Sequence, residues 1–166
     1  MIDTDYRTAA TRCALWIALL LGGAQIAEHA LYMEPCPLCL TQRVFFILAG
    51  FAAFAAMHAT HPSRGWSLLT GLFALGGLAF ALRQLYLYTL PPEQIPACTA
   101  PIGMLIEFAP IAEVLRAMTM GTGNCAEDSF PVFGLQVPGI AIPLAALIGF
   151  IGVLFLVAQQ LRRLDR

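Results

Sequence analysis

Lysine is missing from this 166-residue sequence, and charged residues of any kind are scarce. They make up 11% of the chain against 59% for hydrophobic residues, so there are too few polar side chains to cover a soluble domain of this size. The nine basic residues are all arginines, and a formal net charge of −1 provides no general attraction for polyanions. We therefore expect a membrane protein, and we expect no binding of nucleic acid.

Long apolar runs account for most of the chain, and four of them are close to the roughly 20 residues that a helix needs to cross a bilayer core. None alternates with a period of two, which favours helices over the strands of a membrane barrel. The first run is too long for the core of a signal peptide, so we expect it to remain in the protein. The predicted fold is an all-α bundle of four transmembrane helices, a single integral-membrane domain over residues 1–166, with spans at about 13–33, 40–59, 66–88 and 138–160.

Arginines are distributed unequally between the ends of these spans. Those on the opposite side from the termini are Arg43, at a span edge, and Arg116, in a loop. Because positively charged loops stay in the cytoplasm, both termini are predicted to be cytoplasmic. Two loops, at about 32–41 and 90–137, then face the oxidising, periplasmic side. The arginines assigned to the cytoplasmic side are Arg7, Arg12, Arg64, Arg162, Arg163 and Arg166.

The second predicted loop is long and rich in proline, and long loops of this kind are usually functional. One part of it has the pattern of a short helix. Pro110 suits a first helical position, and apolar residues then recur at helical spacing at Ile111, Val114, Leu115 and Met118. This helix either lies on the membrane surface as an interfacial helix or packs on neighbouring loop residues.

Cysteine carries the predicted chemistry. Cys36, Cys39, Cys98 and Cys125 fall in the two loops, whereas Cys13, at the cytoplasmic edge of the first span, is expected to be a small buried apolar residue. Four cysteines allow three pairings. The Cys-Pro-Leu-Cys spacing closes a very small ring that adds little stability, and such pairs are typically redox-active. We therefore predict redox disulfides Cys36–Cys39 and Cys98–Cys125.

Two alternatives remain for these cysteines. They could form purely structural disulfides, as in a four-span structural protein, although this leaves the short CxxC ring unexplained. They could also form a four-thiolate zinc site, which is disfavoured because the distant pair lacks CxxC spacing and the compartment is oxidising. We accordingly predict no metal.

Cys39 stands at the start of the second span, where unpaired backbone N–H groups and the helix dipole stabilise a thiolate. Arg43 follows one turn later on the same face. The next turn is occupied by Phe46 and Ile47, so we expect the partner of Arg43 to be an oxygen outside the chain. A thiolate, an arginine and an apolar wall suit an amphipathic electron acceptor with carbonyl groups, such as a quinone.

Other polar and small residues within the predicted spans give weaker indications. Glu28 and Arg83 either pair with each other or reach the membrane interface separately, and we favour the second arrangement. His29 is expected to be interfacial. Positions expected to permit close helix packing are Gly22-Gly23, Gly76-Gly77 and Gly149 with Gly152.

A resemblance to the DsbB family, disulfide bond formation protein B, is carried by four segments that occur in the same order as in that family. Together with the order of four spans and two loops, they cover nearly the whole chain, which makes the resemblance far more specific than a lone CxxC. The segments are Pro35-Cys36-Pro37-Leu38-Cys39-Leu40-Thr41-Gln42-Arg43, Gln94-Ile95-Pro96-Ala97-Cys98, Gly123-Asn124-Cys125-Ala126-Glu127 and Phe133-Gly134-Leu135.

The resemblance implies a thiol oxidase of the bacterial inner membrane that reoxidises a periplasmic DsbA-like dithiol protein and passes the electrons to a respiratory quinone, ubiquinone or menaquinone. It implies that Cys98 forms the mixed disulfide with the partner. Cys125 would be its pair and would link transiently to Cys36. By the same resemblance, Cys39 meets the quinone ring and Arg43 holds and polarises a quinone oxygen.

The chain departs from some relatives at one position. They carry a histidine near the periplasmic end of the third span, where this chain reads Arg83-Gln84-Leu85-Tyr86, so any role of that histidine does not carry over. A DsbB paralogue dedicated to one special client remains an alternative. A quinone reductase similar to vitamin K epoxide reductase is disfavoured, because there the CxxC follows the loop pair whereas here it comes first.

Overall fold

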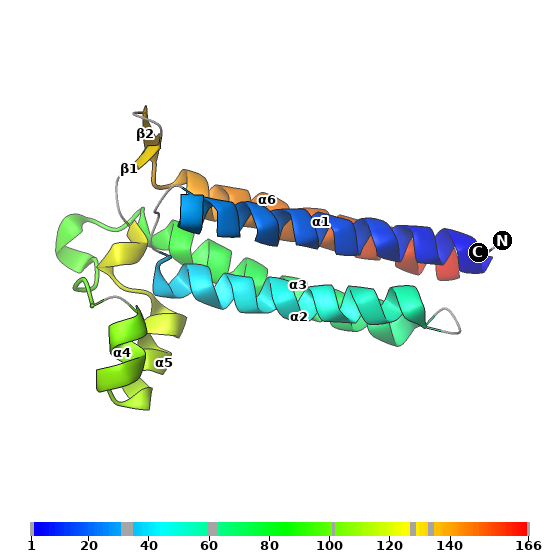
Figure 1. The fold of residues 1–166 in the computed structure, drawn as a ribbon, viewed down its shortest axis with the longest axis horizontal. Coiled ribbons are helices and arrows are strands. Elements are labelled where there is room, and N and C mark those ends of the chain that lie inside the picture. Colours follow the sequence, from blue (N-terminus) through cyan, green and yellow to red (C-terminus); the bar gives the residue numbers. More distant parts are fainter. Residues whose placement is uncertain are drawn as a thin grey trace.

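Four long helices run side by side and form a bundle (Figure 1). They are α1 (Ile2–Ala30), α2 (Pro37–His58), α3 (Arg64–Leu87) and α6 (Ala141–Leu164). The structure is a computed structural model and describes residues 2–30, 35–59, 63–100, 102–126, 129–132 and 135–165. All four helices are long and apolar enough to cross a membrane. The predicted all-α bundle of four membrane-spanning helices is confirmed.

The helices differ from the predicted spans chiefly at the N-terminus. α1 begins at Ile2 rather than near residue 13, because its polar first turns have a buried face. Tyr6 and Ala10 pack against Ala56 of α2, and the Tyr6 hydroxyl donates a hydrogen bond to the carbonyl oxygen of Ser63 at 2.9 Å. Hydropathy identifies the apolar part of this helix, whereas its full length depends on these contacts with other helices.

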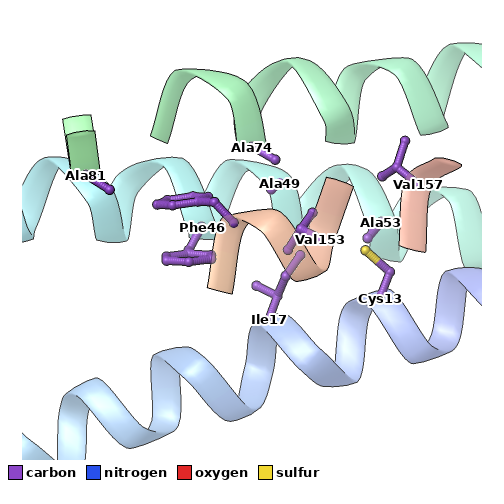
Figure 2. Close-up of a cluster of buried hydrophobic side chains, with 10 residues drawn as sticks. Cys13, Ile17, Phe46, Ala49, Ala53, Ala74, Ala81, Val153 and Val157 are labelled. Atoms are coloured by element: carbon purple, nitrogen blue, oxygen red, sulfur yellow. The ribbon is translucent and has the colours of Figure 1, made fainter. Parts of the chain in front are cut away.

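Small side chains at the centre of the bundle let the helices approach one another closely. Ala49, Ala53 and Ala74 are fully buried there (Figure 2). Phe46 of α2 stacks on Phe150 of α6 with the ring centroids 3.8 Å apart. The core therefore combines two stacked aromatic rings with alanines and a few β-branched residues, and small residues at such contacts are typical of helices that pack within a bilayer.

The expectations for Cys13 and the glycines have different outcomes. Cys13 is fully buried in the central cluster, as predicted (Figure 2). A Cβ at Gly77 would collide with the ring of Phe150, so this glycine permits close packing as expected. A Cβ at Gly22 or Gly23 would meet nothing within 4 Å, and the prediction is wrong for that pair.

The connection between α3 and α6 lies at the end of the bundle opposite the two termini (Figure 1). The hairpin that it contains is not predicted by the sequence analysis, because four-residue strands are too short to show a period of two. The strands pair antiparallel, with Ser129 opposite Pro138. The elements of this connection are η1 (Pro92–Gln94), α4 (Ile102–Phe108), α5 (Ile111–Met120), η2 (Gly123–Ala126), β1 (Ser129–Val132) and β2 (Leu135–Pro138).

α5 is the predicted short helix of the second loop. Pro110 is its N-cap rather than its first residue, and the helix begins at Ile111. Val114 is buried against Leu105 of α4, so one face of the helix packs on neighbouring loop residues, as one of the two alternatives predicted. Ile111 and Leu115 nevertheless remain exposed. Contact of this exposed face with a membrane surface stays a prediction.

Candidate redox site

The start of α2 brings two cysteines into contact. Cys36 is the N-cap residue, and its Sγ accepts a hydrogen bond from the backbone N–H of Cys39 at 3.3 Å. Pro37 takes the first helical position, where a missing N–H leaves no partner unsatisfied. The Sγ atoms of Cys36 and Cys39 are 2.7 Å apart. The predicted local pair is therefore a contact in the structure, while its redox role stays a prediction.

The short helix η2 contributes a third sulfur. Cys125 is buried among Leu38 and Leu87, and its Sγ is hydrogen-bonded to the Cys36 thiol. The chain reaches this position through Gly121, whose φ of 82° lies in the left-handed region. A side chain at Gly121 would also collide with Leu38 and Leu87. Cys36 therefore contacts two other sulfurs, those of Cys39 and Cys125.

Hydrogen bonds within the reduced cluster favour negative charge on Cys125. The pKa of Cys125 is lowered to about 6, and the largest cause is the hydrogen bond from the Cys36 thiol. Hydrogen bonds from the backbone of Thr122 and Leu38 lower this pKa further. Together these bonds outweigh burial, which raises it. The bonds to Cys125 and Cys39, together with burial, raise the pKa of Cys36 well above its ordinary value. Of these two neighbouring sulfurs, Cys125 is therefore the one whose surroundings favour the thiolate form.

Cys98 lies beside the same short helix but faces solvent. Its neighbour Thr99 is joined to Asn124 by two hydrogen bonds, one from the Thr99 N–H to the Asn124 side-chain oxygen at 2.9 Å and one in return at 3.3 Å. All five cysteines are free thiols, so the disulfide between Cys98 and Cys125 stays a prediction. Among the described residues, no group of three or more His, Cys, Asp or Glu side chains is arranged to hold a metal ion.

Two buried glutamines complete the sulfur cluster. The side-chain nitrogen of Gln84, from α3, lies 3.5 Å from Cys39 Sγ, 3.6 Å from Cys36 Sγ and 3.5 Å from the carbonyl oxygen of Cys125. Gln42, from α2, donates a hydrogen bond to the side-chain oxygen of Gln84 at 2.9 Å. Contact of Gln84 with the sulfurs is not predicted by the sequence, in which Gln84 stands out only as a departure from the histidine of some relatives. The sequence did contain one signal for a functional role of Gln84, namely a polar amide side chain within an apolar span.

The structure contradicts the prediction that Arg43 has its partner outside the chain. Its guanidinium forms a salt bridge with the Glu28 carboxylate of α1 and donates to the carbonyl oxygen of Ala24 at 3.1 Å. The prediction considered only the face of α2, whereas the acid belongs to a neighbouring helix. Glu28 and Arg83 do not pair, and Arg83 donates instead to the carbonyl oxygen of Met120.

A cavity of about 370 Å³ opens beside this cluster, between α1, α2, α3 and α6. Most of its wall is apolar, and polar groups occur where it reaches the cysteines. Such a cavity covers an apolar ring and tail while its N–H donors meet carbonyl oxygens. The residues present therefore fit a quinone. The polar part of the wall includes Glu28, Cys36, Cys39, Gln42, Arg43 and Gln84.

Four apolar helices with a cluster of cysteine thiols at one end define a multi-pass membrane protein. The family model for disulfide bond formation protein DsbB matches residues 6–158, nearly the whole chain. The chain therefore belongs to the DsbB family of membrane proteins that form disulfide bonds. Parts of the first predicted loop and of the quoted motifs lie outside the described residues, namely 32–34, Glu127, Phe133 and Gly134.

Curated relatives extend over most of the chain. Disulfide bond formation protein B of Hahella chejuensis is 41% identical over 150 residues, which cover 89% of this chain and 90% of the relative. Disulfide bond formation protein B 1 of Pseudomonas aeruginosa is 40% identical over 147 residues, covering 87% and 88%. The Marinobacter nauticus protein of the same name is 42% identical over 125 residues, covering 72% and 73%. No solved structure matches the chain.

Proposed function

We propose that the protein is a thiol oxidase of the bacterial inner membrane that reoxidises a periplasmic DsbA-like dithiol protein and passes the electrons to ubiquinone or menaquinone. The observation that carries this proposal is the position of the CxxC sulfurs. Cys36 packs against Cys125, and Cys39 lines an apolar cavity that also contains Arg43. Membership of the DsbB family supports the disulfide-forming chemistry.

The proposed relay consists of thiol–disulfide exchanges. A thiolate of the reduced partner attacks Cys98 in the Cys98–Cys125 disulfide, and Cys125 leaves as a thiolate. Cys125 then attacks Cys36, and Cys39 leaves with the electron pair of the broken bond. Each exchange forms one sulfur–sulfur bond and breaks one. The second thiolate of the partner attacks the mixed disulfide, which releases the oxidised partner and leaves Cys98 as a thiolate. Cys98 then attacks Cys125 in the Cys36–Cys125 disulfide, which restores the Cys98–Cys125 pair and leaves Cys36 and Cys39 reduced. A bound quinone would supply the acceptor for the two electrons and two protons released when Cys36 and Cys39 become a disulfide again, so the net products are an oxidised partner and a quinol.

The exposure of the cysteines supports this order of events. Cys98 faces solvent, where a soluble protein can reach it, whereas Cys125 is 1% exposed and faces the internal cavity, so a soluble protein does not reach it directly. Cys39 lines the cavity between the helices, where a lipid-soluble acceptor can enter. Two pairs are thus required because the electron donor is in water and the acceptor is in the bilayer.

Anaerobic mixing of the purified protein with a reduced DsbA protein and either quinone tests the proposal. The quinone absorbance is expected to fall by one equivalent for each partner dithiol oxidised. A Cys39→Ser variant should abolish this change while still forming a mixed disulfide between Cys98 and the partner. Oxidation of the partner no faster than in buffer would instead support a four-span protein with structural disulfides.

A further inference from the structure

Gln84 contacts both CxxC sulfurs and the backbone of the buried Cys125. Its side chain is 1% exposed, and its amide nitrogen is 3.5 Å from Cys39 Sγ and 3.6 Å from Cys36 Sγ. The same nitrogen is 3.5 Å from the carbonyl oxygen of Cys125. A carboxamide offers two N–H donors and carries no charge. It can therefore stabilise a thiolate without adding a net charge to a buried site.

Gln42 determines which end of the Gln84 amide faces the sulfurs. Its nitrogen donates to the Gln84 oxygen at 2.9 Å, and both side chains are buried. Because the oxygen accepts this bond, the Gln84 nitrogen takes the position nearer the sulfurs, 3.5 Å from Cys39 Sγ, while the Gln84 oxygen is 3.8 Å from the same sulfur. Gln42 also lies in the same helix as Cys39, so donor and sulfur are held in register by two packed helices.

We propose that Gln84 is a catalytic residue of the exchange between the two cysteine pairs and that Gln42 is its positioning residue. When Cys125 Sγ bonds to Cys36 Sγ, the Cys36–Cys39 bond breaks and its electron pair stays on Cys39. No proton or external oxidant is consumed in this step. The N–H groups of Gln84 stabilise the charge that develops on Cys39, and the bond to the Cys125 carbonyl holds the attacking residue in place. The inference rests on the proposed function, of which this exchange is one step.

The test uses the full-length protein carrying Cys13→Ala and Cys98→Ser, which requires neither partner nor quinone. In this parent protein the thiol of Cys125 faces the Cys36–Cys39 disulfide. Each attack on Cys36 releases Cys39 as a thiol that a maleimide captures. Peptide mapping distinguishes labelled Cys39 from labelled Cys125, so the rate of exchange is measured directly.

Gln84→Met removes the N–H donors while keeping a similar side-chain volume. It is expected to slow Cys39 labelling about 10- to 100-fold, the usual effect of losing a hydrogen bond to a charged group. Gln42→Met should slow labelling less, because Gln84 itself remains. In Gln84→Glu, the ratio of variant to parent rate should fall as pH rises and the introduced carboxyl ionises, because two negative charges then repel. A purely structural role would not produce this pH dependence.

Gln160→Met is the matched control. Gln160 is also 1% exposed, but it lies in α6, where its side-chain oxygen accepts a hydrogen bond from Ser67, and it does not line the cavity. Equal rates in the parent and in Gln84→Met, or equal slowing in Gln84→Met and Gln160→Met, overturn the inference and leave the proposed function intact. If Cys39 is never labelled in the parent, the two pairs do not exchange, and the proposed function itself fails.

Discussion

Arg43 and Glu28 form a charged pair in the polar part of the cavity wall, within a bundle that is mostly apolar. An unpaired charge in such surroundings costs several kcal/mol, and a partner with good hydrogen bonds offsets much of that cost. The two side chains are 18% and 29% exposed. A guanidinium has five N–H donors, so bonds to Glu28 and to the Ala24 carbonyl leave donors for a further oxygen in the cavity. The pairing with Glu28 thus orients Arg43 and is compatible with the proposed contact to a quinone.

Substitutions of Arg43 should change the quinone step and spare thiol exchange. Arg43→Lys keeps the charge but loses the planar fork, and we expect it mainly to raise the KM for quinone. Arg43→Ala should raise the KM further and also lower kcat, because no positive charge then stabilises the negative charge that develops on the reduced quinone. Exchange between the partner and Cys98 should continue in both variants. Steady-state quinone reduction and single-turnover thiol exchange measure the two steps separately.

The double variant Arg43→Ala/Glu28→Gln provides the control. It removes the arginine without leaving a carboxylate unpaired in the bundle. If Arg43 serves only to pair with Glu28, the double variant will regain normal quinone kinetics, whereas our proposal expects no recovery. Loss of thiol exchange in Arg43→Ala would mean that Arg43 supports the fold of the cysteine site.

At the scale of the helices, small residues decide how closely the functional side chains approach. Burial of apolar surface does not drive association between helices in lipid, so close packing contributes a larger part of the free energy of association. Gly77 of α3 lies against the ring of Phe150, which in turn stacks on Phe46 of α2. Two turns further along α3, Gln84 reaches the sulfurs at the start of α2. Gly77 therefore sets how closely α3 approaches α6 and, through the stacked rings of Phe150 and Phe46, affects the position of α2 at the site.

Gly77→Ala is expected to lower the midpoint of thermal unfolding in detergent, measured by circular dichroism. The added methyl group would overlap the Phe150 ring and cost about 1–3 kcal/mol through overpacking. Gly22→Ala is the control, since its methyl group would meet no atom within 4 Å, and alanine favours the helix. Equal midpoints for the two variants would show that Phe150 moves aside without cost.

At the scale of the whole molecule, the start of α2, the end of α3 and the connection between α3 and α6 lie together at the end opposite both termini (Figure 1). α2 provides Cys36 and Cys39, α3 provides Gln84, and η2 provides Cys125. The proposed relay needs this end to face the compartment that contains the soluble partner. The arginine distribution independently predicts that it is periplasmic.

Cysteine labelling of intact spheroplasts tests this orientation. After reduction, a membrane-impermeant maleimide should label the exposed Cys98, whereas an introduced Thr4→Cys, exposed near the N-terminus, should react only after the membrane is permeabilised. Cys13 is not a useful reporter, because it is fully buried and would be protected on either side. Labelling of Thr4→Cys in intact spheroplasts, with Cys98 protected, would reverse the orientation and remove the argument from an oxidising compartment.

The sequence by itself determined the features that depend on order along the chain. Apolar runs of sufficient length predicted the four helices, and periodicity predicted α5. The contact between Cys36 and Cys39 also follows from sequence, because a CxxC at a helix start closes within one turn. The ordered motifs were sufficient to identify the family.

Only the tertiary structure decided which side chains from different segments meet. It paired Arg43 with Glu28, placed Gln84 against the sulfurs and brought Cys125 to Cys36. Periodicity describes one helix at a time and says which face is apolar. It does not say which residue of a neighbouring helix lies opposite, because that depends on how far each helix rotates and slides as the small residues between them pack.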